Sequence, residues 1–112
     1  LQNLAEARYR VGALKLDYAM RHNDVPTGAW RSVGATQCAF FLESFVDEIA
    51  RATRKDPLEL RRELLAHDAR ALKVVETAAA KAGWGADGRG TPGKPLPKGH
   101  ALGLAYYESY GS

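Results

Sequence analysis

The spacing of hydrophobic positions changes its period twice along the chain. Between residues 9 and 21, apolar and polar side chains alternate. Successive side chains of a β-strand point to opposite faces, so this period of two predicts a half-buried strand. The same alternation from residue 100 to residue 110 predicts a second strand. The apolar positions of the two segments are Leu14, Leu16, Tyr18 and Met20, then Leu102, Leu104, Tyr106 and Tyr110.

Between these segments the apolar residues recur every three or four positions, which predicts three helices at residues 36–53, 57–66 and 69–82. The expected apolar stripe of the first helix consists of Cys38, Leu42, Phe45, Ile49 and Ala52, widened by Phe41, Val46 and Ala50. Its expected polar side carries Glu43, Asp47, Glu48 and Arg51. A stripe this wide is typical of a helix packed inside a larger body.

The ends of these helices carry recognisable capping residues. Thr36 is the expected N-cap of the first helix, and Asp56 followed by Pro57 is a typical start for the second. Asp68 should cap the third helix, and Gly83 suits the left-handed position that ends it. The expected buried residues are Leu58, Leu60, Leu64 and Leu65 in the second helix, and Leu72, Val75, Ala78, Ala79 and Ala82 in the third. The expected fold class is therefore α+β, with three helices flanked by strands.

Length and composition favour a single globular unit. The 112 residues are 46% hydrophobic and 26% charged, which is typical of a folded domain or part of one. Residues 85–99 are rich in glycine and proline, and we expect a flexible surface loop there. No run of about 18 apolar residues is present to span a membrane. The only methionine is Met20, and we expect this sequence to be an internal segment of a longer protein.

Charge and cysteine content exclude some classes of function. The net charge of +3 is spread among acidic residues, whereas a nucleic-acid site would need a clustered basic surface. Cys38 is the single cysteine, so neither an intrachain disulfide nor a cysteine metal site can form. The three histidines are far apart in the sequence, and we interpret them as surface residues rather than metal ligands: His22, His67 and His100.

A loop that leads into the first helix is the strongest candidate for chemistry. It reads Val-Pro-Thr-Gly-Ala-Trp-Arg-Ser-Val-Gly over residues 25–34. Backbone N–H groups in a glycine-bearing loop can approach a ligand closely, and a helix start favours anions. Ordinary helix capping explains the same pattern without a ligand. These residues by themselves leave both interpretations open.

Three sequence blocks together resemble a known family. They are the loop at residues 25–34, Phe-Leu-Glu-Ser-Phe-Val-Asp-Glu-Ile-Ala at 41–50, and Lys-Asp-Pro-Leu-Glu-Leu-Arg at 55–61. In this order they resemble the molybdenum hydroxylases, the xanthine dehydrogenase and aldehyde oxidase family. The likeness is to the molybdopterin-binding subunit of the isoquinoline 1-oxidoreductase type, and it covers nearly the whole chain.

The resemblance implies a set of cofactor-binding residues: Trp30, Arg31, Ser32, Val33, Gly34 and Gln37. Arg31 stands where the family places an arginine near the metal. Val33 stands where several xanthine-oxidising members carry a stacking aromatic residue, which disfavours purine substrates. Ser32 replaces a glycine that is common in other members. The family's catalytic glutamate lies outside this segment, so we expect no catalytic or metal-ligating residue here and interpret Glu43 as structural.

The resemblance further implies an oxidoreductase that hydroxylates aldehydes or N-heterocycles with water as the oxygen source. Its cofactor would be molybdopterin, in the cytosine dinucleotide form. The implied partners are the remainder of the same subunit, an iron–sulfur subunit or domain, and a small-molecule substrate. Cytoplasmic and periplasmic locations both stay open. We expect the isolated segment to hold no cofactor and to be inactive.

A second interpretation is a small helical binding or regulatory module without catalysis, because three amphipathic helices and a basic isoelectric point would serve one. The loop at residues 30–34 distinguishes the two interpretations, since a binding module does not need this sequence before the helix.

Overall fold

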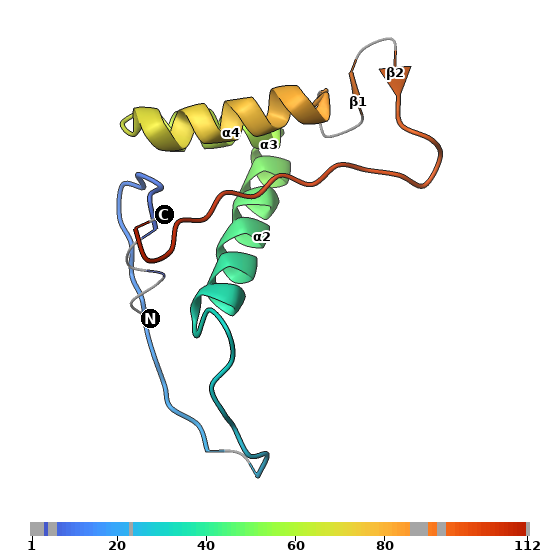
Figure 1. The fold of residues 1–112 in the computed structure, drawn as a ribbon. Coiled ribbons are helices and arrows are strands. Elements are labelled where there is room, and N and C mark those ends of the chain that lie inside the picture. The colour runs from blue at the N-terminus through green and yellow to red at the C-terminus, as the bar shows by residue number, and fades with distance from the viewer. Residues whose placement is uncertain (1–3, 5–6, 23, 86–89, 92–93, 112) are drawn as a thin grey trace.

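The computed structural model describes residues 4, 7–22, 24–85, 90–91 and 94–111, and within them the chain forms three helices (Figure 1). Helix α2 spans Ala35–Thr53, α3 spans Pro57–Leu65 and α4 spans Ala69–Ala82. Helix α3 packs against both other helices. The expected helices at 36–53, 57–66 and 69–82 are therefore confirmed to within one residue.

The expected strands at residues 9–21 and 100–110 are wrong. Both segments are extended, but neither pairs with a neighbouring strand. In the described residues the only strand pairing is a two-residue antiparallel ladder, in which β1 (Gly90–Thr91) pairs with β2 (Lys94–Pro95). The fold is thus all-helical rather than α+β. Alternation indicates an extended chain, whereas a strand also requires a partner for its backbone hydrogen bonds.

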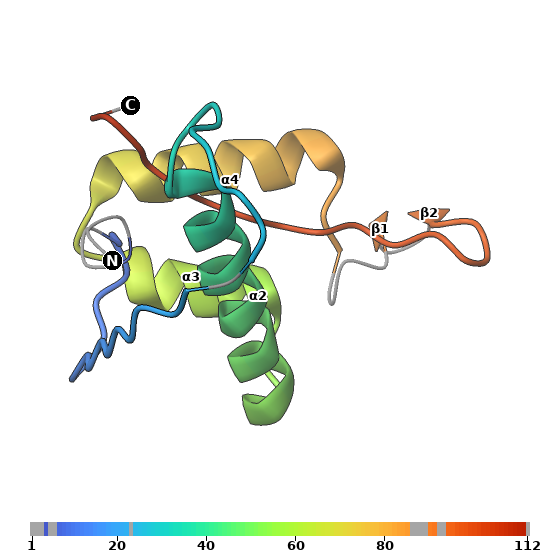
Figure 2. The same ribbon diagram turned by 90° about the horizontal axis from the view of Figure 1, so that it is seen from below.

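The apolar side chains of the first extended segment confirm that it lies on no sheet, because they are exposed rather than covered: Leu14, Leu16, Tyr18 and Met20. Figure 1 and Figure 2 show β1 and β2 projecting away from the helices, within the expected flexible loop at residues 85–99. Residues 86–89 and 92–93 of that loop lie outside the described residues, so its flexibility stays a prediction.

Local capping explains where α3 and α4 begin. The Oδ1 atom of Asp56 accepts hydrogen bonds from the N–H groups of Leu58 and Glu59 at 2.8 and 3.2 Å. Asp68 caps α4 in the same way, accepting from the N–H groups of Arg70 and Ala71 at 3.1 and 3.0 Å. Both acidic caps are confirmed.

The other two predicted helix ends had opposite outcomes. Gly83 ends α4 in the left-handed conformation with φ 66°, as predicted. Thr36 is not the N-cap of α2: Gly34 occupies that position, and no side chain caps the helix. Helix α2 therefore begins at Ala35, two residues earlier than an N-cap at Thr36 predicts.

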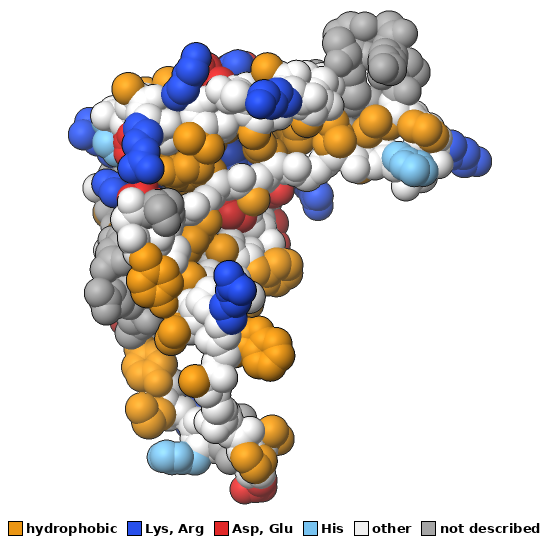
Figure 3. Space-filling view, in the orientation of Figure 1, with side chains coloured by type: hydrophobic (Ala, Val, Ile, Leu, Met, Phe, Trp, Pro, Cys, Tyr) orange, Lys and Arg blue, Asp and Glu red, His pale blue; other side chains and the backbone are white. Residues whose placement is uncertain are grey.

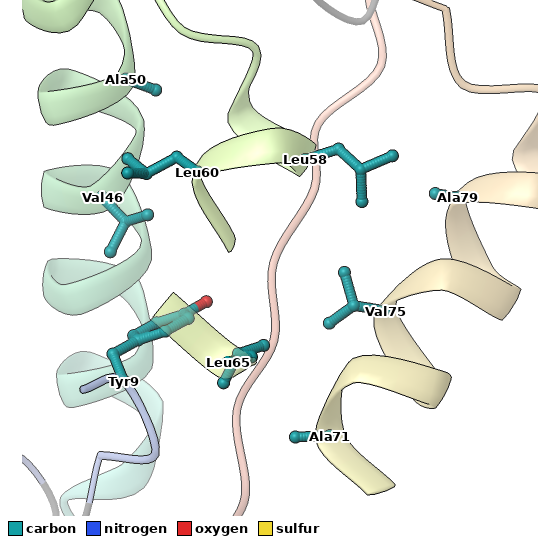
Figure 4. Packing of buried hydrophobic residues seen from close by; sticks show 9 residues of the cluster. All are labelled: Tyr9, Val46, Ala50, Leu58, Leu60, Leu65, Ala71, Val75 and Ala79. Atoms are coloured by element: carbon teal, nitrogen blue, oxygen red, sulfur yellow. The ribbon is translucent and has the colours of Figure 1, made fainter. Parts of the chain in front are cut away.

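The core lies where α3 is sandwiched between α2 and α4 (Figure 4). From α3, Leu60 points toward Val46 on α2, and Leu58 points toward Ala79 on α4. The buried cluster consists of Tyr9, Val46, Ala50, Leu58, Leu60, Leu65, Ala71, Val75 and Ala79. Leu42, Ile49, Leu64, Trp84, Leu104 and Tyr106 pack against it while only partly buried.

The buried stripe of α2 is rotated from the one predicted. Phe41 and Phe45 were expected inside, but both are exposed. Ala52, Ala78 and Ala82 are also exposed, and Leu72 is half-buried. The neighbouring helix covers the face of α2 that carries Val46 and Ala50, and in the described residues nothing covers the phenylalanine side. The spacing of apolar residues identifies the apolar positions of a helix, but it does not show which of them a neighbouring element covers.

The chain is less compact than a self-contained domain of its size. Its radius of gyration is 16.2 Å, against about 13 Å for a compact domain of this length. Figure 1 shows the reason, since the extended segment before α2 hangs below the helices. None of the helices in the described part of the chain is both long and apolar enough to cross a membrane.

Candidate functional site

The predicted site residues gather at the N-terminal end of α2, where residues 31–34 form a turn. The N–H of Val33 donates to the carbonyl of Trp30 at 3.0 Å, and the N–H of Ala35 donates to that of Ser32 at 2.9 Å. Ser32 and Val33 have φ angles of 70° and 50°, in the left-handed region. This conformation is uncommon for non-glycine residues and a clear outlier for β-branched valine. Strain of this kind tends to concentrate at ligand sites.

The turn presents its side chains to the surface. Trp30 is 81% exposed and Val33 is 69% exposed, so Trp30 is not a core residue of the described fold. Arg31 and Gln37 are exposed, whereas Ser32 and Gly34 are half-buried. The structure therefore brings all six predicted residues to one end of one helix.

Arg31 is available to a ligand, because it forms no ion pair with any other residue that the structure describes. The hydroxyl of Ser32, by contrast, is engaged within the turn by the carbonyl of Arg31 and the hydroxyl of Thr36. Ser32 thus shapes the loop, and Arg31 supplies its free positive charge.

The chemistry of this end of α2 suits an anionic ligand that accepts hydrogen bonds. The helix start has no side-chain cap and no acidic residue in its first turn. Its N–H groups and the positive end of the helix dipole favour negative charge. Arg31 adds a permanent cation with several donors, and Gln37 adds an amide. Phosphate groups and ring carbonyls are acceptors that match this set of donors. In the described residues, no group of histidine, cysteine, aspartate or glutamate side chains could hold a metal ion directly.

A buried ion-pair network lies further along α2, centred on Arg61 of α3. Its side chain is fully buried, and its Nε and Nη2 atoms donate to Oε2 of Glu43 at 3.0 and 2.9 Å. Nη1 donates to Oδ1 of Asp47 at 2.7 Å and to the carbonyl of Pro57 at 3.1 Å. The interpretation of Glu43 as structural agrees with this geometry, but its expected position on the polar side of α2 is wrong, because only 6% of Glu43 is exposed. Asp47 can pair with Arg51 one turn away, but it pairs with Arg61 instead.

The same network holds the C-terminal extended segment against the helices and lies beside Tyr9 of the N-terminal one. Oε2 of Glu43 also accepts the backbone N–H of Tyr106 at 2.9 Å, which is why this segment needs no strand partner there. The hydroxyl of Tyr9 is buried, and burial followed by the nearby Glu43 carboxylate raises the pKa of Tyr9 above its ordinary value. Tyr9 is therefore neutral in the folded protein at physiological pH.

A surface ion pair joins the two extended segments to each other. Nε and Nη2 of Arg8 donate to the carboxylate of Glu108 at 3.0 and 2.7 Å. These hydrogen bonds lower the pKa of Glu108. Figure 1 shows the first and last described parts of the chain, in blue and red, on the same side of the molecule, consistent with this contact.

The sequence contains a signal for this network that the period of the apolar residues alone does not show. Leu58, Arg61 and Leu65 are spaced three and four apart, which places Arg61 on the buried face of α3. A charged residue at such a position requires a buried partner. The two acidic residues Glu43 and Asp47, one turn apart on the preceding helix, were the candidates.

A pocket of about 520 Å³ lies at the other end of α2 and is lined in part by Arg51, Arg54 and Lys55. Helix α2 has 19 residues, and at about 1.5 Å per residue the pocket and the loop are too far apart to form one site. The loop at residues 30–34 is therefore the candidate functional site on its own.

Comparison with known sequences gives the class of protein to which this loop belongs. Residues 1–65 match the family described as the molybdopterin cofactor-binding domain, and this range contains the loop, α2 and α3. The match covers more than half of the chain. The chain therefore belongs to the molybdopterin cofactor-binding family of the molybdenum hydroxylases, as its three sequence blocks predicted.

One curated relative makes the comparison more specific. The isoquinoline 1-oxidoreductase subunit beta of Brevundimonas diminuta is 35% identical over 101 residues, which cover 88% of this chain and 12% of that protein. The chain thus spans about an eighth of the length of this relative. No solved structure matches the chain significantly.

Proposed function

We propose that this chain forms one wall of the molybdopterin site in the catalytic subunit of a molybdenum hydroxylase. This subunit would hydroxylate aldehydes or N-heterocycles with oxygen from water. The observation that carries the proposal is the strained turn at residues 30–34. At the uncapped start of α2 it presents Arg31, which has no ion-pair partner among the described residues. This turn lies inside the sequence range that matches the cofactor-binding family.

The residues of the turn would have different roles in holding the cofactor. Arg31, the amide of Gln37 and the backbone N–H groups that follow Gly34 would donate hydrogen bonds to acceptor oxygens of the cofactor. Ser32 holds the turn in shape through its hydroxyl contacts. When bound, the molybdopterin supplies the metal and the redox chemistry.

Trp30 and Val33 would face the substrate side of the same wall. Both are apolar and exposed, so they offer contact area without charge. A valine cannot stack on a ring as an aromatic residue would, and the absence of stacking at Val33 favours aldehydes or smaller N-heterocycles over purines.

Three further features of the complete protein belong to the proposal. The cofactor would be the cytosine dinucleotide form of molybdopterin. The rest of the catalytic subunit would supply the remaining walls and the catalytic glutamate. Electrons would leave through an iron–sulfur subunit or domain. The relative's description as a subunit beta supports an enzyme built from more than one chain.

Substitution of Arg31 in the complete enzyme tests the proposal. Arg31→Ala should lower kcat/KM by about 10²-fold, the effect of removing one well-placed charged donor, while the Tm stays near that of the parent. Arg31→Lys should recover only part of the activity, because an ammonium lacks the planar fork of the guanidinium. Arg51→Ala is the matched control, since Arg51 is exposed on the same helix but lies near its other end.

Molybdenum content and steady-state kinetics, measured on the same preparations, are the readouts. If Arg31→Ala retains parental kcat/KM and parental molybdenum content, Arg31 does not contact the cofactor and the proposed wall is wrong. The alternative of a helical module without catalysis has no structural observation in its favour, because the family match includes the loop that such a module would not need.

A further inference from the structure

Helix α2 presents an aromatic face to solvent on the side opposite the core. Phe41 and Phe45 are one turn apart on this face, and they are 60% and 59% exposed. The ring of the adjacent Phe40, also exposed, meets that of Phe41 edge to face, with their centroids 5.9 Å apart. Burying one phenylalanine side chain contributes about 1.5–3 kcal/mol, so leaving three of them in water is costly.

This aromatic face continues into the candidate site. Trp30 and Val33, at the start of the same helix, are both exposed and apolar. Gln37, between the turn and the phenylalanines, is exposed but uncharged. The next exposed charged residue of α2 is Glu48, since Glu43 is buried and Asp47 is half-buried and paired with Arg61. Figure 3 shows hydrophobic side chains gathered over α2 and the segment below it. Exposed apolar surface of this extent usually marks an interface.

We propose that this aromatic face, Phe41 and Phe45 with Phe40 beside them, docks against an apolar surface formed by the rest of the same catalytic subunit. Docking there would hold the turn at residues 30–34 against the cofactor. This inference rests on the proposed function, which supplies both the cofactor and the larger catalytic subunit.

The length of the relative and the position of the face favour this occupant. The region similar to this chain is 12% of the relative, so most of that polypeptide remains to cover it. A cofactor site buries most of its ligand's surface, so other protein surface must close over the turn. The aromatic face lies on the first half of α2, which follows the turn directly, and the polypeptide that encloses the cofactor would therefore cover the face as well. Between Gln37 and Glu48, Glu43 is buried and both Glu43 and Asp47 pair with Arg61, so no unpaired charge opposes an apolar partner surface there.

Crosslinking identifies the occupant directly. The photoreactive residue p-benzoylphenylalanine, placed at Phe41 in the complete enzyme, keeps an aromatic ring at this position. Mass spectrometry should find crosslinks to residues of the same catalytic subunit outside this sequence. Crosslinks to an iron–sulfur subunit, crosslinks to a second copy of the catalytic subunit, or no crosslinks at all would each overturn the proposal.

Thiol labelling of the complete enzyme measures whether the face is covered. In a Cys38→Ala background, Phe45→Cys should react with a maleimide at least about tenfold more slowly in the native enzyme than after unfolding in urea. The control is Lys73→Cys, at an exposed position of α4, which should show no comparable protection. Equal rates for Phe45→Cys in the two states would refute docking.

These readouts separate the two proposals. Neither crosslinking nor labelling depends on molybdenum content or turnover. If Phe45→Cys is protected but Arg31→Ala keeps parental activity, the docking proposal holds and the proposed cofactor wall is wrong.

Discussion

Replacing Arg61 with leucine should strongly destabilise the helical core. Arg61 is fully buried, and its guanidinium makes four hydrogen bonds to Glu43 and Asp47, counting the carbonyl of Glu43. Leucine fits the apolar surroundings of α3 but donates nothing. The Glu43 carboxylate would then stay buried, and among the residues that the structure describes its remaining donor would be the backbone N–H of Tyr106.

The expected magnitude follows from this geometry. Removing one partner of a buried ion pair typically costs about 3–5 kcal/mol, because the other charge is left without compensation. The total stability of a domain of this size is about 5–15 kcal/mol. Arg61→Leu should therefore remove a large part of the free energy of unfolding. Arg61→Lys should fall between the parent and the leucine variant, because one ammonium cannot reproduce the forked contact with Glu43.

Urea unfolding followed by far-ultraviolet circular dichroism measures these differences. The matched control is Arg62→Leu, which removes the neighbouring arginine from the same helix. Arg62 has a side chain 39% exposed and pairs with Glu59 and Glu76 near the surface. Its loss should cost less than about 1 kcal/mol.

A double substitution tests the reasoning further. Glu43→Leu with Arg61→Leu removes both buried charges at once and should be more stable than Arg61→Leu alone. No uncompensated buried carboxylate remains in the double variant, because the side chain of Asp47, the other partner of Arg61, is 42% exposed and stays hydrated. A parental urea midpoint for Arg61→Leu would contradict this reasoning. So would a double variant that is no more stable than Arg61→Leu.

Three further predictions concern a helix cap, a surface ion pair and the cofactor. Asp56→Ala should lower the free energy of unfolding in urea by about 1 kcal/mol, because it removes the cap of α3 and the acceptor for the indole N–H of Trp84. The fluorescence of Trp84 should change as well. A variant of parental stability would contradict this prediction. Arg8 lowers the pKa of Glu108, so this carboxylate stabilises the folded state above its unfolded pKa of about 4.3 and ceases to do so as the pH falls through its lower folded pKa. Glu108→Gln should therefore flatten the dependence of the urea midpoint on pH below about 4.3, and an unchanged slope would refute the assignment. The purified 112-residue chain should contain no molybdenum by metal analysis, since one wall cannot enclose the cofactor, and stoichiometric metal would show the opposite.

The local features of the helices could be predicted from the sequence because their causes are local. Asp56 and Asp68 cap helices whose first N–H groups lie two or three residues away. Gly83 ends α4 because glycine takes the left-handed conformation without steric cost. The family could be identified for the same reason, since its three blocks are continuous stretches of sequence. The position of the six site residues at one helix end follows from their closeness in the chain.

The tertiary structure decided which surfaces are covered. Phe41 and Val46 are both apolar residues of α2, but α3 packs against the side that carries Val46. Residues 9–21 alternate as a strand does, but alternation cannot supply the neighbouring backbone that a strand needs. Arg61 is buried because Glu43 and Asp47 meet it from α2, a contact between residues at least 14 positions apart. Capping depends on neighbours in the chain, whereas burial, strand pairing and ion pairing depend on neighbours in space, which only folding brings together.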